Sequence, residues 1–133
     1  MSERSVNAGV PRPDPLLSPA DVVQLGIDAL RENDAPYADR GVETVYAFTT
    51  PAVRRATGPF TRFTGIVHRN YRPLLDIDRA GTTPVEQSGD RASQEVTVVA
   101  PDGDEAVYEF RLARQSGGAD DGCWLVDGVS RIA

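Results

Sequence analysis

The hydrophobic pattern changes its period once along the chain, near Asp78, and this change restricts the possible folds. Before that point, apolar residues recur every three or four positions, which is typical of one face of an α-helix. After it, apolar and polar residues alternate, as in a half-buried β-strand. Short links with turn-forming residues join the alternating segments, so neighbouring strands are expected to be antiparallel. The pattern predicts an α+β domain, with three N-terminal helices packed on an antiparallel sheet of about four strands.

The first helix has the clearest start. Ser18 is a good N-cap, Pro19 suits the first helical position, and Asp21 stands at the third position of a capping box. The helix is expected to fade by Asn33. Its buried face is predicted to consist of four apolar residues at helical spacing, namely Val22, Val23, Ile27 and Leu30.

Two further helices are predicted over about 39–48 and 59–69, with a short helical piece at 52–57 between them. The Gly58-Pro59 dipeptide separates that piece from the third helix. The four strands are predicted over residues 79–87, 92–100, 106–115 and 123–132. Residues 1–17 are polar, rich in proline and without period, so we expect a flexible tail followed by a single domain over 18–133.

The chain has one cysteine, Cys123, which excludes an intramolecular disulfide and a zinc site built from cysteines. No apolar run approaches the roughly 18 residues of a membrane-spanning helix. The tail lacks the apolar centre of a signal peptide. We therefore expect a cytoplasmic protein with no membrane association, no metal and no cofactor.

All 14 basic residues are arginine, and the net charge is -6 because 20 residues are acidic. Codon usage in a GC-rich genome and adaptation to a salt-rich cytoplasm both produce this composition, and the sequence leaves the choice open. An acidic chain is a poor general nucleic-acid binder, so we expect no nucleic-acid partner.

Two parts of the sequence resemble a known family. One is residues 51–63 (PAVRRATGPFTRF) followed by 71–75 (YRPLL), and the other is residues 121–129 (DGCWLVDGV). With the Ser18-Pro19 helix start, they resemble the family called domain of unknown function 4864, over roughly residues 17–129. That family is similar in its element order to the NTF2-like (cystatin-like, "cone") superfamily.

The resemblance implies a strongly curved antiparallel sheet with a pocket between sheet and helices, and a homodimer. Superfamily members include steroid isomerases, small dehydratases and polyketide cyclases, and also non-catalytic transport and association domains. The resemblance therefore implies no particular reaction and transfers no established catalytic residue.

Five arginines lie between residues 51 and 75, where there is no Asp or Glu. The planar guanidinium suits a carboxylate or phosphate, so Arg54 and Arg62 are candidate ligand-binding residues. Trp124 is a third candidate, although a core or interface role is common for tryptophan. Internal pairing with carboxylates explains the same arginines without any ligand, and a nucleic-acid surface is the weakest explanation. The five are Arg54, Arg55, Arg62, Arg69 and Arg72.

Three residues are candidate catalytic groups. Strand alternation places Leu125 and Asp127 on one face, and Asp127 at the rim of a pocket could act as a base. His68 is the single histidine and the ordinary proton carrier near neutral pH. Tyr108 could offer its hydroxyl to a ligand. The simpler interpretations are a turn cap or a pair with Arg54 or Arg62 for Asp127, exposure without a role for His68, and core packing for Tyr108.

We therefore predict a small NTF2-like domain that binds a small or anionic molecule in a pocket between helices and sheet. The first alternative is a non-catalytic dimerisation or protein-interaction module whose pocket is filled by its own side chains. The second is an isomerase or dehydratase-like enzyme with Asp127 or His68 as base and Tyr108 as electrophile. Whether the protein is an enzyme stays open at this point.

Overall fold

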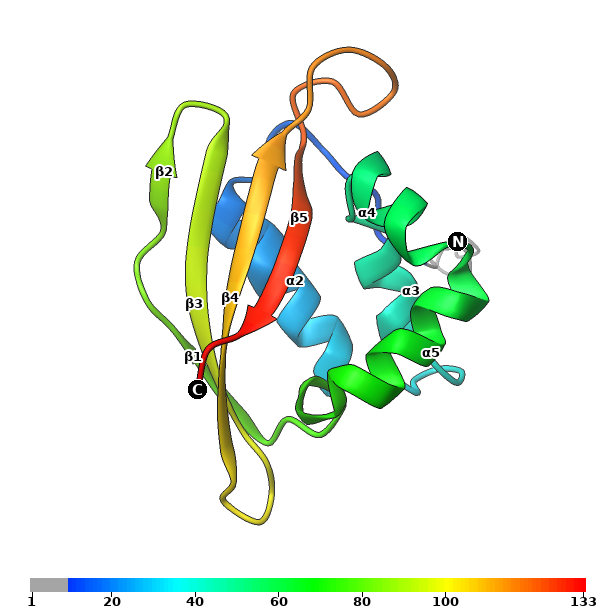
Figure 1. Ribbon diagram of the computed structural model, residues 1–133, viewed down its shortest axis with the longest axis vertical. Helices are drawn as coiled ribbons and strands as arrows, with labels where there is room; N and C mark the ends of the chain where they lie inside the picture. The colour runs from blue at the N-terminus through cyan, green and yellow to red at the C-terminus, as the bar shows by residue number, and fades with distance from the viewer. Residues whose placement is uncertain (1–9) are drawn as a thin grey trace, which may run out of the picture.

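A computed structural model describes residues 10–133, so residues 1–9 of the predicted tail lie outside the described residues. Figure 1 shows helices on one side of a single sheet, and the predicted α+β class is confirmed. The described residues form four α-helices and one short 3-10 helix: α2 (Pro19–Arg31), α3 (Arg40–Ala47), α4 (Pro51–Thr57), α5 (Phe60–Asn70) and η1 (Arg72–Leu75). Within this range, no helix is long and apolar enough to cross a membrane.

Five strands form one antiparallel sheet in the described part of the chain. They are β1 (Arg79–Thr82), β2 (Glu86–Ser88), β3 (Arg91–Val99), β4 (Glu105–Arg114) and β5 (Trp124–Arg131). The order is β1-β3-β4-β5, and β2 pairs with β3 as well. Because β3, β4 and β5 follow one another in sequence and in space, the predicted meander is present.

The strand predicted over 79–87 is two strands, β1 and β2, separated at Pro84. Proline has no amide hydrogen and interrupts a hydrogen-bonded ladder. Around the break, Thr83 donates its amide to Glu95 O (3.0 Å), and Gln94 donates Nε2 to Thr83 O (2.7 Å). The number of strands in the prediction was therefore too low by one, because it treated Pro84 as an ordinary strand residue.

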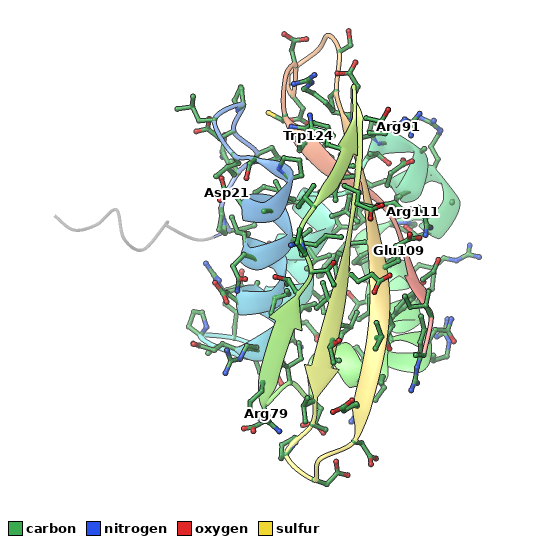
Figure 2. All side chains as sticks on the ribbon, turned by 90° about the vertical axis from the view of Figure 1, so that its left-hand side faces the viewer. Asp21, Arg79, Arg91, Glu109, Arg111 and Trp124 are labelled. Carbon is green, nitrogen blue, oxygen red and sulfur yellow. The ribbon has the colours of Figure 1, made fainter. Side chains whose placement is uncertain are left out.

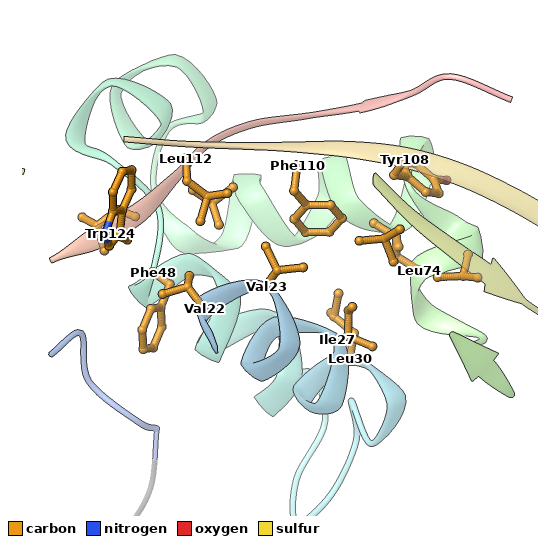
Figure 3. Close-up of a cluster of buried hydrophobic side chains, with 14 of the residues drawn as sticks. Val22, Val23, Ile27, Leu30, Phe48, Leu74, Tyr108, Phe110, Leu112 and Trp124 are labelled. Atoms are coloured by element: carbon orange, nitrogen blue, oxygen red, sulfur yellow. The ribbon is translucent and has the colours of Figure 1, made fainter. Parts of the chain in front are cut away.

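Helix α2 packs directly on the sheet, as its sequence predicts. The capping box is present: Asp21 N donates to Ser18 Oγ (3.1 Å), and Ser18 N donates to Asp21 Oδ2 (2.9 Å). The whole predicted apolar face of the helix is buried, and Figure 3 shows it against the inner side chains of β4, among them Phe110 and Leu112. Burial of this apolar face stabilises the packing of α2 as a second layer against the sheet.

Helices α3, α4 and α5 lie beside the free edge of β5 rather than under the middle of the sheet (Figure 1). One short stretch joins them to that edge: Val126 N donates to Phe48 O (2.7 Å), and Thr50 N donates to Val126 O (2.9 Å). The ring of Tyr46 packs against Phe60 and Phe63, with centroids 5.5 and 5.0 Å apart. The three helices therefore form a wall that meets β5 near its start.

Candidate functional site

An apolar cavity of about 400 Å³ lies between this helical wall and strands β4 and β5. The helices contribute Val45, Val53 and Ile66, and the strands contribute Phe110 and Val126. This volume is within the range of about 300–1,000 Å³ that small-molecule sites occupy. The cavity is thus large enough to take a small ligand.

The local sequence explains why the space stays open. The α4–α5 connection turns sharply at Gly58, whose φ of 84° favours glycine. Beyond Asp127, one hydrogen bond among the described residues ties the free edge of β5 to the helical side, from the Tyr71 hydroxyl to Val129 O (3.0 Å). Close pairing at one end of β5 and a single bond at the other leave the cavity between them.

Arg111 provides the charge at the rim of the cavity. It pairs with Gly128 across the β4–β5 ladder, and both residues line the cavity. Its Nη1 donates to Glu109 Oε1 (3.2 Å) and to Ser130 Oγ (3.0 Å). A Cβ added to Gly128 would lie 2.2 Å from Nη2 of Arg111, so the guanidinium occupies space that glycine leaves free.

In the part of the chain that the structure describes, the cavity lining offers no carboxylate, imidazole or thiol as a general base. Among the described residues that line it there is no Asp, Glu, His or Cys, and its ionisable side chains are Tyr71 and Arg111. General acid–base catalysis needs a group that accepts a proton within hydrogen-bond distance of the substrate. In residues 10–133 there is also no group of three or more His, Cys, Asp or Glu placed to hold a metal ion. The arrangement suits binding of an apolar body with a polar end.

A family model matches residues 18–133, and its description is Domain of unknown function (DUF4864). The chain belongs to the DUF4864 family. The match covers all the helices and strands described above. Comparison of this DUF4864 protein with curated proteins, and separately with solved structures, gives no significant match.

Asp127 of the DUF4864 domain does not line the cavity, and it lies instead in a separate, more polar hollow with Arg91 and Glu109. Its carboxylate accepts from Thr50 Oγ1 (2.9 Å) and pairs with Arg91 Nη1 (3.2 Å). The β4–β5 register shifts here, because Gly128 pairs with Arg111 and Val126 with the next residue. Asp127 is the extra, bulged residue. Because the carboxylate of Asp127 pairs with Arg91, the predicted pairing of Asp127 with Arg54 or Arg62 is wrong.

His68 pairs with the carboxylate of Asp39, a contact that the sequence analysis did not predict. Its Nε2 lies 2.8 Å from Asp39 Oδ1, and Asn33 Nδ2 donates to the same oxygen (2.8 Å). Both side chains of the pair are partly exposed, and neither lines the cavity. His68 is therefore a link between α5 and the start of α3, and the interpretation as an exposed residue without a role is wrong.

Asp39 carries the pH dependence of this link. Partial burial raises the pKa of its carboxyl group, but hydrogen bonds from Asn33 and His68 and the charge of His68 lower it below the ordinary value. A carboxyl group whose pKa is lower in the folded state stabilises the fold above its unfolded pKa, and this stabilisation is lost as pH falls through the folded pKa.

We expect Asp39→Asn to flatten the loss of stability as the pH falls below the ordinary aspartate pKa of about 4, because asparagine has no proton to gain there. Asparagine tolerates the left-handed backbone at this position (φ 60°). Urea unfolding at a series of pH values measures the effect, and Asp76→Asn, on an exposed residue, controls for the change in net charge. The same change in the free energy of unfolding with pH in the wild type and in Asp39→Asn would contradict the prediction.

Tyr108 is fully buried and does not line the cavity. Within the described residues its hydroxyl has no hydrogen-bond partner, and burial raises its pKa. Its ring lies 6.2 Å from that of Tyr71, whose own hydroxyl is bonded to Val129 O. Tyr108 is therefore a core residue in this structure, in agreement with the simpler of its two interpretations.

The two tyrosines give opposite expectations for the loss of one hydroxyl. Tyr108→Phe removes a buried group without a partner and should raise the free energy of unfolding by about 1 kcal/mol. Tyr71→Phe breaks a bond and leaves the carbonyl of Val129 unpaired, and should lower it by about 1 kcal/mol. Urea unfolding of both variants tests this pair. Destabilisation by Tyr108→Phe would mean that its hydroxyl has a partner in solution.

The predicted ligand-binding residues do not meet at the cavity. Arg54 donates Nη2 to Thr49 O (2.7 Å), and its guanidinium lies 5.8 Å from the Tyr46 ring centroid. Arg62 is exposed, while Trp124 is buried near one end of the sheet (Figure 2), with Arg114 over its ring at 5.1 Å. None of the three lines the cavity, whereas Arg111, which the sequence analysis did not select, does.

The five arginines of residues 51–75 have no carboxylate partner among the described residues. Four arginines of the sheet do have one, namely Arg79, Arg91, Arg111 and Arg114. Internal pairing therefore accounts for these four arginines of the sheet. It does not account for those of α4, α5 and η1.

Proposed function

We propose that this DUF4864 domain binds a small, largely apolar molecule in the cavity between α3–α5 and strands β4 and β5. The observation that carries the proposal is a cavity of about 400 Å³ with apolar walls and one guanidinium at its rim. A pocket with apolar walls and a few polar groups is the usual form of a small-molecule site. The order of helices, sheet and intervening pocket also supports an NTF2-like cone.

Binding is better supported than catalysis. The candidate bases Asp127 and His68 are each occupied by partners on the protein, and neither lines the cavity. Tyr108 is fully buried and does not line the cavity. An isomerase or dehydratase mechanism would need a proton acceptor beside the ligand, and the described lining offers none.

Filling the cavity tests the proposal. Val53→Phe adds a ring to the lining, and Val85→Phe adds the same ring to a half-buried position between β1 and β2. A neutral apolar fluorophore, N-phenyl-1-naphthylamine, is titrated into each protein. We expect saturable binding to the wild type and Val85→Phe, and an affinity lowered by about tenfold or more in Val53→Phe, since the ring occupies ligand volume.

Thermal melting of each variant confirms that it is folded before titration. Equal affinity of Val53→Phe and wild type would place the fluorophore elsewhere and contradict the proposal. Failure of the wild type to bind it would contradict the proposal as well.

A second candidate function is a protein-interaction or dimerisation module. The observation in its favour is the unpaired arginines of α4, α5 and η1, of which Arg55, Arg62, Arg69 and Arg72 are exposed. Such a surface fits an acidic partner, and the rest of this acidic chain is one source of carboxylates.

Sedimentation velocity at low and high salt measures self-association, and titration with poly-glutamate measures binding of the protein to an acidic polymer. We expect both to weaken in a triple Arg55, Arg62 and Arg69→Gln variant. They should persist in the matched triple Arg79, Arg91 and Arg114→Gln variant of the sheet. Equal behaviour of the two variants would contradict an interaction surface on the helices.

A further inference from the structure

We propose that the ligand of the cavity is an amphipathic carboxylate, with its apolar chain between the helical wall and the sheet and its carboxylate on Arg111. This inference rests on the proposed function and assigns the class of ligand and the residue that selects it. Both follow from how the guanidinium is placed at the cavity rim.

Gly128 is the residue that allows this placement. Its φ is not among the positive values, so the glycine is not required by backbone conformation. Instead, a Cβ at this position would lie 2.2 Å from Nη2 and 3.0 Å from Cζ of Arg111. The absence of a side chain on β5 lets the guanidinium lie over the edge strand and reach the rim. Figure 2 shows Arg111 on the side of the sheet turned away from α2, beside Glu109.

The guanidinium of Arg111 has hydrogen-bond donors that no other described residue uses. Both of its hydrogen bonds, to Glu109 and Ser130, use Nη1. Within the part of the chain that the structure describes, Nε and Nη2 make none. A carboxylate accepts two parallel hydrogen bonds from a guanidinium, which makes it the natural partner of an arginine with unused donors.

The charges at the cavity rim favour a ligand head group with a single negative charge. Arg111 is the single charged side chain among the described lining residues, and Glu109 at 3.2 Å offsets part of its charge. A cationic head group would be repelled by the guanidinium, and a doubly charged phosphate would meet only one cation with a carboxylate beside it. The apolar walls require the remainder of the ligand to be hydrocarbon.

Decanoate and decanol are a suitable pair of probes, because they share a chain and differ in the head group. Calorimetric titration below their aggregation concentrations should show about tenfold tighter binding of decanoate to the wild type. Arg111→Gln should abolish this preference while leaving decanol binding unchanged. Arg91→Gln is the matched control, because it removes an arginine of the same sheet that does not line the cavity, and it should preserve the preference.

Two further variants separate position from charge. Gly128→Ala keeps Arg111 but displaces its flexible end from the rim, so it should also abolish the preference for decanoate. Glu109→Gln removes the competing carboxylate and should increase decanoate affinity several-fold without changing decanol affinity. A merely structural role of Arg111 would produce neither result.

The outcomes distinguish the two proposals. If decanol and decanoate bind with equal affinity and Arg111→Gln changes neither, the inference about the ligand is overturned and the cavity remains a binding site. If neither probe binds the wild type and the neutral fluorophore does not bind, the proposed function fails and the inference fails with it. If the fluorophore binds but neither probe does, the carboxylate ligand is overturned alone.

Discussion

Gly41→Ala should be among the most destabilising single substitutions in this domain, lowering the free energy of unfolding by about 3 kcal/mol. Gly41 is buried in the first turn of α3, where α3 crosses α2. A Cβ there would lie 2.3 Å from the carbonyl oxygen of Ala29 and 2.8 Å from Oδ1 of Asn33. The nearest atom belongs to the backbone of α2, so relief requires the two helices to move apart.

Gly26→Ala is the matched control, since Gly26 lies inside α2 and its added Cβ would meet nothing closer than 3.9 Å. Alanine is favoured over glycine in a helix by about 1 kcal/mol, so this variant should be more stable than the wild type. Urea unfolding monitored by the fluorescence of Trp124 measures both. A Gly41→Ala variant as stable as the wild type would show that the α2–α3 contact is loose.

Asn33→Ala should cost about 2–3 kcal/mol, because it removes several hydrogen bonds at one buried point. Asn33 Oδ1 accepts from the amide of Val42 (2.9 Å), and its Nδ2 donates to Asp39. Val42 is fully buried, so its amide cannot turn to water once Asn33 is truncated. An unsatisfied buried donor costs more than an ordinary hydrogen bond contributes.

Urea unfolding again gives the measurement, with Asn70→Ala at the exposed end of α5 as the control for loss of an asparagine. Asn33→Asp is informative as well, because it keeps the acceptor for Val42 but turns the donor to Asp39 into a second carboxylate. It should be destabilised at pH 7 and recover in part as the pH is lowered. A loss below 0.5 kcal/mol in Asn33→Ala, roughly the effect of a surface substitution, would contradict the account.

These contacts connect the corner of α2 and α3 to the cavity. Asn33 holds the start of α3, Asp39 bonds both Asn33 and His68, and His68 belongs to α5. Helix α5 contributes Phe63, Ile66 and Val67 to the lining. The polar network thus connects α5, and with it part of the cavity lining, to α2 and the start of α3.

Local signals in the sequence predicted most of the fold. The cap at Ser18 and the apolar face of α2 depend on residues within one helix, and both are present as expected. The order of helices and strands follows from hydrophobic period and turn residues, which are also local. Pro84 carried a local signal for a strand break that the prediction overlooked.

The candidate site was harder to predict because it depends on contacts between distant segments. The arginine-rich segment drew attention to Arg54 and Arg62, whereas the rim residue Arg111 is defined by its register with Gly128. Strand alternation predicted Gly128 and Val126 on the same face. The bulge at Asp127 breaks that alternation, and nothing in the spacing of a single strand reveals it. A glycine inside a predicted strand was the one available signal for close approach of another group.

The bulge also makes the place of a deletion in β5 decisive, because loss of one residue here would close the bulge. Loss of Asp127 would leave Gly128 opposite Arg111 in a regular ladder, so the room for the guanidinium would remain. Loss of Gly128 would instead bring Asp127 opposite Arg111, and a side chain would occupy that room. When DUF4864 sequences are aligned, the placement of a gap at this point therefore decides which residue is assigned to the position beneath the guanidinium.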